Sequence, residues 1–304
     1  MNPLSSKASS VLLTARLLSV GVFFCLVSPA VSQPLESTGE SEVSKIEIDS
    51  DTEAFSDRTL QDGPIQVTVS YAPARPGNLT TENLQYEVAY LTEQGLNTAN
   101  LLEAVDAYYF ANVSLTDLDS DGVVEVVVQN YSGGAHCCTN TTVHTWQGDQ
   151  FKTLETGYSD GLGGEFQDLD GDGLSEFVSF DNRFLYRFSS YAGSFPPPFV
   201  RTFDKGEFID STRQYPEIIR ERIARAEAIF TDGSFTGERN GLLAGYVAMK
   251  SLVGEYDEGW SFMLERYDRN SNWGLEIRDE DGEEIGTHPD FPTALADFLS
   301  QAGY

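Results

Sequence analysis

Hydrophobic and polar residues alternate strictly over two segments in the first third of the chain. Apolar side chains take every second position from Ile65 to Tyr71 and again from Leu84 to Tyr90. A period of two residues directs one side of an extended chain into a core, so both segments are predicted β-strands. Between Leu96 and Val105 the sequence predicts a short helix.

A unit of four short predicted strands occurs twice between residues 109 and 210. In each unit an acidic loop is followed by a stretch rich in β-branched or aromatic residues, which favours a strand. The two units lie about 50 residues apart, a spacing typical of β-propeller blades. The predicted strands are 109–115, 125–129, 142–146 and 151–154 in the first unit, and 165–167, 177–180, 184–188 and 199–203 with 207–210 in the second.

Beyond Ser211 the hydrophobic period changes to that of a helix. Ile219, Ile223 and Ala226 share one helical face, and similar faces follow in 242–253 and 256–267. A hairpin is predicted around residues 281–282, and a last helix after residue 290. The predicted fold class is α+β, with a β-rich domain of propeller-blade-like repeats at residues 63–210 and a mainly α-helical C-terminal domain at residues 211–304.

Two nine-residue acidic loops connect the first two strands of each unit. Both follow the pattern D-x-D-x-D-G-x-x-E, in which four carboxylates and the backbone carbonyl at position 7 can surround one cation. Several oxygen ligands at a flexible turn favour Ca²⁺ over Mg²⁺. Neither loop is an EF-hand, because position 12 is Val128 or Ser179 and not the required glutamate. The predicted ligands are Asp117, Asp119, Asp121, Val123 and Glu125 in the first loop, and Asp168, Asp170, Asp172, Leu174 and Glu176 in the second.

The alternative interpretation of these loops is a pair of ordinary Asp-Gly turns with solvated acids. Four like charges in nine residues repel one another without a counter-ion. This repulsion favours the metal-site interpretation, and two Ca²⁺ ions are predicted.

The loops and the strands after them resemble FG-GAP/VCBS repeats, the calcium-bearing blades of integrin-α-like β-propellers, over residues 108–212. The resemblance implies Ca²⁺ bound by the loop carboxylates and an assembled surface that serves adhesion or ligand binding. Two features depart from that family. Position 9 is more often Asp there but is Glu125 and Glu176 here, and only two repeats are visible where a closed propeller needs at least four blades. An open sheet, a sandwich or a partial propeller covered by the C-terminal helices is therefore expected.

Residues 1–32 have the features of a secretory signal peptide. Lys7 and Arg16 precede a short apolar core, and a small-x-small cleavage site ends at Ser32. Residues 33–62 are rich in Ser, Thr, Asp and Glu and are predicted to form a disordered acidic linker. No other segment is apolar enough to cross a bilayer. The predicted protein is exported, to the periplasm, the cell surface or the extracellular space, with no stable membrane insertion after signal cleavage.

The chain is strongly acidic, with 48 Asp and Glu residues against 19 Lys and Arg residues and a net charge of −29. Such a charge repels nucleic acid and attracts divalent cations. Cys137 and Cys138 are adjacent, and in an oxidising compartment they can close a vicinal disulfide that binds a ligand ring or only staples the chain. A zinc site with His136 is disfavoured, because successive side chains of a strand point to opposite faces.

Recognisable catalytic motifs are absent from the sequence. There is no H-E-x-x-H, no G-x-S-x-G and no phosphate-binding Gly-Lys loop. We therefore expect a non-enzymatic binding or cell-envelope interaction protein, with a protein or glycan as ligand. The alternative is a secreted glycan hydrolase that uses a pair of carboxylates, since 48 acids offer many pairs at a suitable separation.

Overall fold

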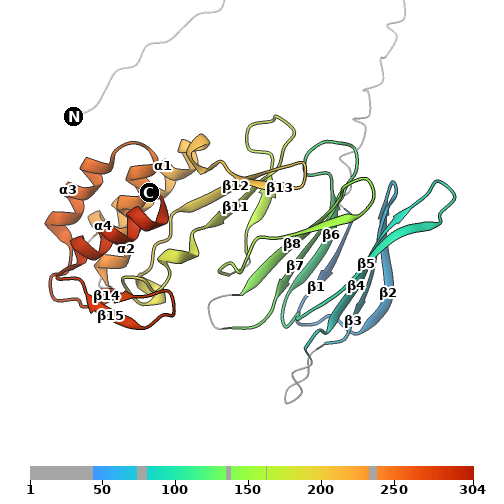
Figure 1. The fold of residues 1–304 in the computed structure, drawn as a ribbon, viewed down its shortest axis with the longest axis horizontal. Helices are drawn as coiled ribbons and strands as arrows, with labels where there is room; N and C mark the ends of the chain where they lie inside the picture. The colour runs from blue at the N-terminus through green and yellow to red at the C-terminus, as the bar shows by residue number, and fades with distance from the viewer. Residues whose placement is uncertain (1–43, 74–80, 135–137, 162, 233–237) are drawn as a thin grey trace, which may run out of the picture. The chain divides into compact units, whose positions relative to one another are not determined.

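The computed structural model describes residues 44–73, 81–134, 138–161, 163–232 and 238–304. The predicted signal peptide, the start of the predicted linker and Cys137 lie outside these residues. Three antiparallel sheets are followed by four α-helices and a two-stranded hairpin (Figure 1). This architecture confirms the predicted α+β class, with the β-rich part first.

The first sheet is a four-stranded antiparallel meander in the order β2-β3-β4-β5. The strands β3 and β4 are the two alternating segments, and their apolar positions are buried. The strand β5 replaces the predicted helix at 96–105, because it pairs with β4 and leaves alternate side chains half-buried. Cross-strand pairing therefore decides the conformation there. The strands are β2 (Phe55–Asp62), β3 (Ile65–Tyr71), β4 (Leu84–Leu91) and β5 (Asn97–Val105).

The second sheet has five strands in the order β1-β6-β7-β8-β9. Its first strand pairs antiparallel with β6, so that Ile46 lies opposite Val113. Because β1 and β2 both fall within residues 33–62, the predicted disordered linker is wrong for residues 44–62. Ile46 and Ile48 alternate with polar residues and are buried, and this local pattern outweighs the acidic composition. The strands are β1 (Ser44–Ile48), β6 (Ala111–Thr116), β7 (Glu125–Tyr131), β8 (Thr139–Trp146) and β9 (Phe151–Glu155).

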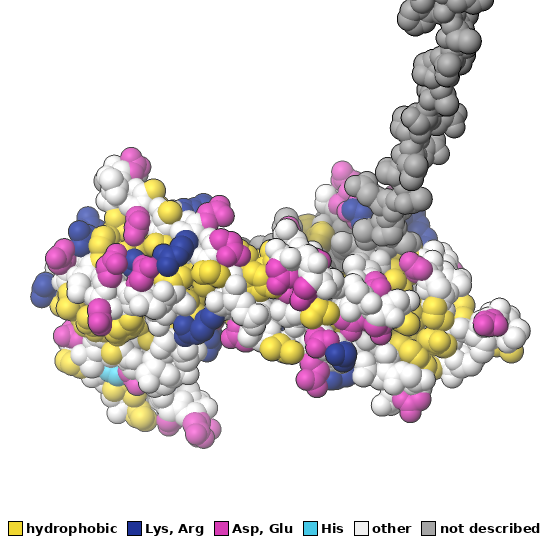
Figure 2. All heavy atoms as spheres, turned by 90° about the horizontal axis from the view of Figure 1, so that it is seen from above, with side chains coloured by type: hydrophobic (Ala, Val, Ile, Leu, Met, Phe, Trp, Pro, Cys, Tyr) yellow, Lys and Arg dark blue, Asp and Glu magenta, His cyan; other side chains and the backbone are white. Residues whose placement is uncertain are grey.

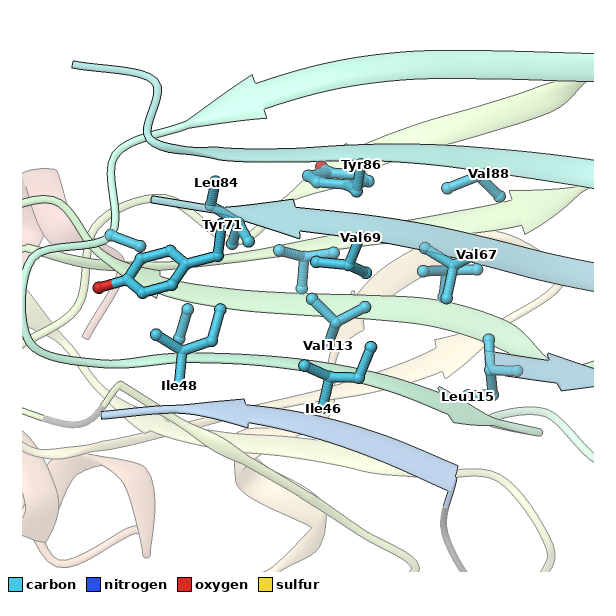
Figure 3. Close-up of a cluster of buried hydrophobic side chains, with 14 of the residues drawn as sticks. Ile46, Ile48, Val67, Val69, Tyr71, Leu84, Tyr86, Val88, Val113 and Leu115 are labelled. Carbon is cyan, nitrogen blue, oxygen red and sulfur yellow. The ribbon is translucent and has the colours of Figure 1, made fainter. Parts of the chain in front are cut away.

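The first and second sheets face each other around a shared apolar core (Figure 3). The hydroxyl of Tyr86 on β4 and Nε2 of His144 on β8 are 3.0 Å apart in a buried hydrogen bond between the sheets. The two sheets thus form a sandwich. The core side chains labelled in the figure are Val67, Val69, Tyr71, Leu84, Tyr86 and Val88 from the first sheet, and Ile46, Ile48, Val113 and Leu115 from the second.

The third sheet is a four-stranded meander in the order β10-β11-β12-β13. Together with β6 to β9 it matches the strands predicted for the two units except at 184–188. The predicted strand at 184–188 is wrong, because Phe184 lies in the short helix η1 (Asn182–Phe184) and packs with Phe188 in the helical core. No closed propeller is formed by the part of the chain that the structure describes. The strands are β10 (Glu165–Gln167), β11 (Glu176–Phe180), β12 (Pro198–Asp204) and β13 (Glu207–Asp210).

The C-terminal helices and hairpin follow the predicted order. The side chain of Asp290 accepts a hydrogen bond from the Thr293 N–H and caps the last helix. A Cβ atom at Gly245 would lie 1.8 Å from the Phe195 carbonyl oxygen, so only glycine permits this close contact. Within the described residues, no helix is both long and apolar enough to cross a membrane. The elements are η2 (Tyr191–Gly193), η3 (Thr212–Gln214), α1 (Pro216–Asp232), α2 (Arg239–Leu252), α3 (Tyr256–Arg266), β14 (Glu276–Arg278), β15 (Glu284–Thr287) and α4 (Phe291–Ala302).

Candidate metal centre

The two acidic loops occupy equivalent places in the two four-strand units. The first loop (residues 117–125) connects β6 to β7, and the second loop (residues 168–176) connects β10 to β11. Each is closed by an antiparallel residue pair, Thr116 with Glu125 and Gln167 with Glu176. The same sequence pattern therefore forms the same strand-loop-strand connection twice.

Two internal hydrogen bonds occur at the same positions in both loops, and the second loop also has one from the Gly171 N–H to Asp168 Oδ1 at 2.7 Å. The carboxylate at position 1 accepts from the N–H at position 6, and the carboxylate at position 5 accepts from the N–H at position 7. The backbone is left-handed at positions 4 and 6 in both loops, which the glycine at position 6 favours. The bonds are Gly122 N to Asp117 Oδ2 (3.1 Å) and Val123 N to Asp121 Oδ1 (2.7 Å) in the first loop, and Gly173 N to Asp168 Oδ2 (3.1 Å) and Leu174 N to Asp172 Oδ1 (2.8 Å) in the second.

The glutamate at position 9 ties each loop to the third strand of its unit. Glu125 accepts hydrogen bonds from the Leu118 N–H at 2.9 Å and from the Thr145 hydroxyl on β8 at 3.0 Å. Glu176 accepts equivalent bonds from the Leu169 N–H at 2.9 Å and from the Thr202 hydroxyl on β12 at 3.0 Å. Both glutamates are buried, so these bonds hold a carboxylate inside the base of each loop.

Each loop brings three of its four predicted carboxylates together. Ligand oxygens of Asp117, Asp119 and Glu125 lie within 4.8 Å of one another, and so do oxygens of the three aspartates of the second loop. Asp121 and Glu176 are not part of these groups. The backbone carbonyls of Val123 and Leu174 stay predicted ligands. The second-loop group is Asp168, Asp170 and Asp172.

Two carboxylate oxygens in the first loop are buried without a hydrogen-bond partner among the described residues, Asp117 Oδ1 and Asp119 Oδ1. A buried oxygen of this kind costs about 1–3 kcal/mol, and more when it is charged. Burial, followed by the charge of Asp121, raises the pKa of Asp119. Burial likewise raises the pKa of Glu125 to about 8, against the lowering effect of the Leu118 N–H. The first loop therefore has a local excess of negative charge that a cation would compensate.

The two loops contact each other directly. The Ser120 hydroxyl donates to the Gly173 carbonyl at 2.6 Å, and the Ser175 N–H donates to the Leu118 carbonyl at 2.8 Å. A third contact comes from the turn between β12 and β13, where the Lys205 N–H donates to Asp119 Oδ2 at 2.9 Å. These bonds attach the first loop to the second unit.

The apolar layer beneath these contacts joins the two units. Leu118, at position 2 of the first loop, is fully buried beside Val127, Val143 and Phe203. Phe203 belongs to β12, whereas Val127 and Val143 belong to β7 and β8. The first loop therefore contributes a core residue to the contact between the units in addition to its carboxylates.

The chain is similar to known proteins at two levels: a family model matches its C-terminal part, and one relative matches nearly its whole length. Residues 219–303 match the family described as "sll0997 C-terminal domain". Over 299 residues the chain is 32% identical to the "Probable thylakoid lumen protein sll0997" of Synechocystis sp. (strain ATCC 27184 / PCC 6803 / Kazusa), which covers 91% of this chain and 87% of that protein. The chain belongs to the sll0997 family.

A second relative is similar over a shorter stretch of the sll0997-family chain. It is the "Uncharacterized protein y4bJ" of Sinorhizobium fredii (strain NBRC 101917 / NGR234), which is 34% identical over 188 residues. The alignment covers 59% of this chain and 30% of y4bJ. No solved structure matches the chain.

The matched C-terminal domain of the sll0997 family lies outside the acidic loops. Residues 219–303 span most of α1 and continue through α4, whereas both loops precede them in the sequence. The alignment with the Synechocystis protein, in contrast, extends over nearly the whole chain. The family model therefore covers only the helical part, whereas the similarity to the Synechocystis protein also covers the β-rich part.

Sequence reasoning missed four residues of this centre. Thr145 and Thr202 hold the position-9 glutamates, and Ser120 and Lys205 connect the units. The two threonines could have been found, because each lies on the third strand of its unit and Thr202 is the direct cross-strand neighbour of Glu176. Nothing in the sequence marks Ser120 or Lys205.

Of the two cysteines in the predicted vicinal disulfide, the structure describes only Cys138. Cys138 is disulfide-bonded. Its predicted partner Cys137 lies outside the described residues, so the pairing stays a prediction.

Proposed function

We propose that this sll0997-family chain binds two Ca²⁺ ions, one in each acidic loop, and that it acts as a non-enzymatic binding protein. The observation that carries the proposal is the pair of buried, unpartnered oxygens on Asp117 and Asp119, which converge with Glu125. A divalent cation supplies the positive partner that these oxygens lack among the described residues. The two shared hydrogen bonds and the converging aspartates of the second loop extend the proposal to that loop.

The ligand chemistry supports calcium over other metals. Every converging ligand atom is a carboxylate oxygen, the type of ligand that hard cations prefer. Two carboxylates about 5 Å apart repel each other by about 3 kcal/mol at an effective dielectric constant of about 20. Ca²⁺ accepts six to eight oxygens in flexible geometry, which suits loops of this kind better than the strict octahedron of Mg²⁺.

Two observations support export as part of the proposal. The sequence begins with the features of a secretory signal at residues 1–32. The Synechocystis relative is named as a probable thylakoid lumen protein. Calcium sites that work outside the cytosol typically have dissociation constants of about 10⁻⁴ to 10⁻³ M. We propose the same range here, with a protein or a glycan as the binding partner.

Calcium titration calorimetry on the mature chain tests the proposal. We expect two ions per chain, and about 1.4 kcal/mol of added stability per ion at tenfold excess over the dissociation constant. A chelator should then lower the melting temperature by several degrees. The substitution Asp117→Asn should remove the site in the first loop, and Asp168→Asn the site in the second.

The hairpin between β14 and β15 offers a matched control. Its sequence Asp279-Glu280-Asp281-Gly282 is an acidic turn that lacks the full loop pattern, and Asp279 Oδ1 accepts the Asp281 N–H at 3.1 Å. Asp281→Asn should leave calcium binding unchanged. Binding of no calcium by the wild-type chain, or an equal loss in the Asp281→Asn variant, would contradict the proposal.

A further inference from the structure

A pocket of about 240 Å³ lies where the third sheet meets the first helix of the C-terminal part. One wall comes from β11 and the start of β12, and the other from α1. Its apolar lining is formed by Val178, Phe180, Pro198 and Ile218. Phe180 is 42% exposed, so its ring is accessible to a ligand. Figure 2 shows hydrophobic side chains gathered over this junction, with basic side chains beside them.

The pocket contains an arginine with an unusual environment. The guanidinium carbon of Arg222 lies 4.4 Å from the ring centre of Phe180 and 4.0 Å from that of Phe195. Its Nε donates to the Pro196 carbonyl at 3.3 Å. None of the ion pairs between described residues includes Arg222, whereas Arg220 on the same helix pairs with Glu255 at 2.9 Å.

This environment costs free energy that an anion would recover. Taking a cation partly out of water is unfavourable unless an opposite charge compensates it, and ring stacking compensates only in part. Burial, followed by the charge of Arg225, lowers the pKa of Arg222 to about 10. In a chain with 48 acidic residues, a half-buried arginine without an acidic partner among the described residues is a candidate for ligand recognition.

The charges that line the pocket define the class of anion. Arg222 and Arg225 provide two positive charges, and Glu221 provides one negative charge. The net charge of +1 matches a monoanion better than a dianion such as phosphate. A planar guanidinium presents two parallel N–H donors that fit both oxygens of a carboxylate. The apolar wall then selects for an apolar or aromatic body.

We propose that this pocket binds a monocarboxylate with an apolar or aromatic body. The carboxylate lies on Arg222 and Arg225, and the body packs against Phe180, Pro198 and Ile218. The volume lies below the usual range of about 300–1,000 Å³ for ligand pockets, so the ligand is small or is the end of a longer chain. The site shares no residue with the calcium loops, and its test is independent of theirs.

The first test compares an acid with its amide on the mature wild-type chain in calcium. The probes are 3-phenylpropanoate and 3-phenylpropanamide, titrated by ligand-observed nuclear magnetic resonance. A ligand of this size has an expected dissociation constant of about 1 mM. We expect the amide to bind at least about tenfold more weakly, because it carries no charge for the two arginines. Equal binding of both probes, or binding of neither, would overturn the proposal.

Substitutions then locate the site. Arg225 is exposed, so Arg225→Gln should keep the fold and weaken the acid about threefold to tenfold. Arg222→Met should weaken it by more than about tenfold. The exposed Arg278 on β14 is the matched control, and Arg278→Gln should have no effect. Unchanged affinity in Arg225→Gln would reject the site even if the Arg222→Met variant does not fold.

A third comparison separates a free acid from the end of a peptide. The probes are N-acetylphenylalanine and a tetrapeptide with a C-terminal phenylalanine, each as the free acid and as the amide. Binding of the tetrapeptide acid at least as tight as that of 3-phenylpropanoate identifies a chain terminus as the ligand. If the small acid binds and the tetrapeptide acid does not, the natural ligand is a free carboxylic acid.

Discussion

The two acidic loops share one sequence pattern and two internal hydrogen bonds, but their surroundings differ. The first loop is covered by the second unit, which contacts it through Ser175 and through Lys205 in the turn between β12 and β13. Leu118 of the first loop is fully buried. The second loop has its three aspartates exposed, because after β13 the chain continues into helices and not into a further unit. The local motif thus sets the positions of the ligands, whereas the neighbouring unit sets their burial.

The position-9 glutamates differ in the same way. Glu176 accepts a further hydrogen bond from the Tyr215 hydroxyl, in addition to those from Leu169 and Thr202. Glu125 converges with two aspartates, whereas Glu176 stays outside the converging group of its loop. Glu125 is thus the glutamate with fewer hydrogen-bond donors and also the one that converges with aspartates. We therefore expect the first loop to depend more strongly on its glutamate.

The largest expected difference between the loops concerns position 2. Replacing Leu118 by Ala removes a fully buried side chain between the units and should cost about 3 kcal/mol in the free energy of unfolding. The equivalent Leu169 is only half-buried, so Leu169→Ala should cost about 1 kcal/mol. Urea unfolding in calcium measures both values. Equal losses would show that the second unit does not cover the first loop as described.

The second prediction concerns pH. The pKa of Glu125 is raised to about 8 by burial, so the calcium-free folded chain retains a proton that the unfolded chain releases near 4.5. Its stability should therefore fall as the pH rises between these two values. Calcium binding expels the proton, and the affinity of the first loop should rise by up to about tenfold per pH unit below about pH 8.

Calorimetry in two buffers of different ionisation enthalpy detects this proton directly. The substitution Glu125→Gln should abolish the proton release and weaken calcium binding in the first loop. Glu176→Gln serves as the matched variant and should leave the proton release in place. If calcium binding releases the same number of protons from the wild-type chain and from the Glu125→Gln variant, the released proton does not come from Glu125.

The smallest expected effect concerns the contact between the loops. Because the Ser120 hydroxyl binds the Gly173 carbonyl, occupancy of one loop should favour occupancy of the other by about 0.5–1 kcal/mol. The substitution Asp117→Asn should then weaken calcium binding in the second loop about threefold.

Ser120→Gly removes the hydroxyl without adding strain, because Ser120 has a φ of 55° and Gly171 occupies the equivalent position. In this background the second loop should bind calcium with the same affinity whether or not Asp117 is intact. Persistence of the threefold effect would show that the coupling runs through the Leu118 core and not through the serine.

Local patterns in the sequence predicted much of the fold and only part of the site. Alternation identified β3 and β4, and the helical period located α1, α2, α3 and α4. The segment that forms β5 was assigned wrongly, because its conformation depends on pairing with β4 and not on its own composition. Likewise β1 is short, lies in an acidic stretch and is fixed by a partner strand far along the chain.

The site shows the same division between local and distant information. The spacing of the acids identified both loops, and three carboxylates of each loop converge. It did not show that Asp121 and Glu176 lie outside the converging groups. The bond from Lys205 to Asp119 spans 86 positions of the sequence, and such a contact follows only from the packing of one unit on another.

The pairing of β1 with β6 has a consequence for how the chain acquires its structure. Ser44 on β1 lies opposite Leu115 on β6, so this edge strand of the second sheet precedes its partner strand by more than sixty residues in the sequence. Contacts of such separation slow the search for the native arrangement. A chain that emerges from a ribosome or a translocon N-terminus first would expose this strand until β6 follows it.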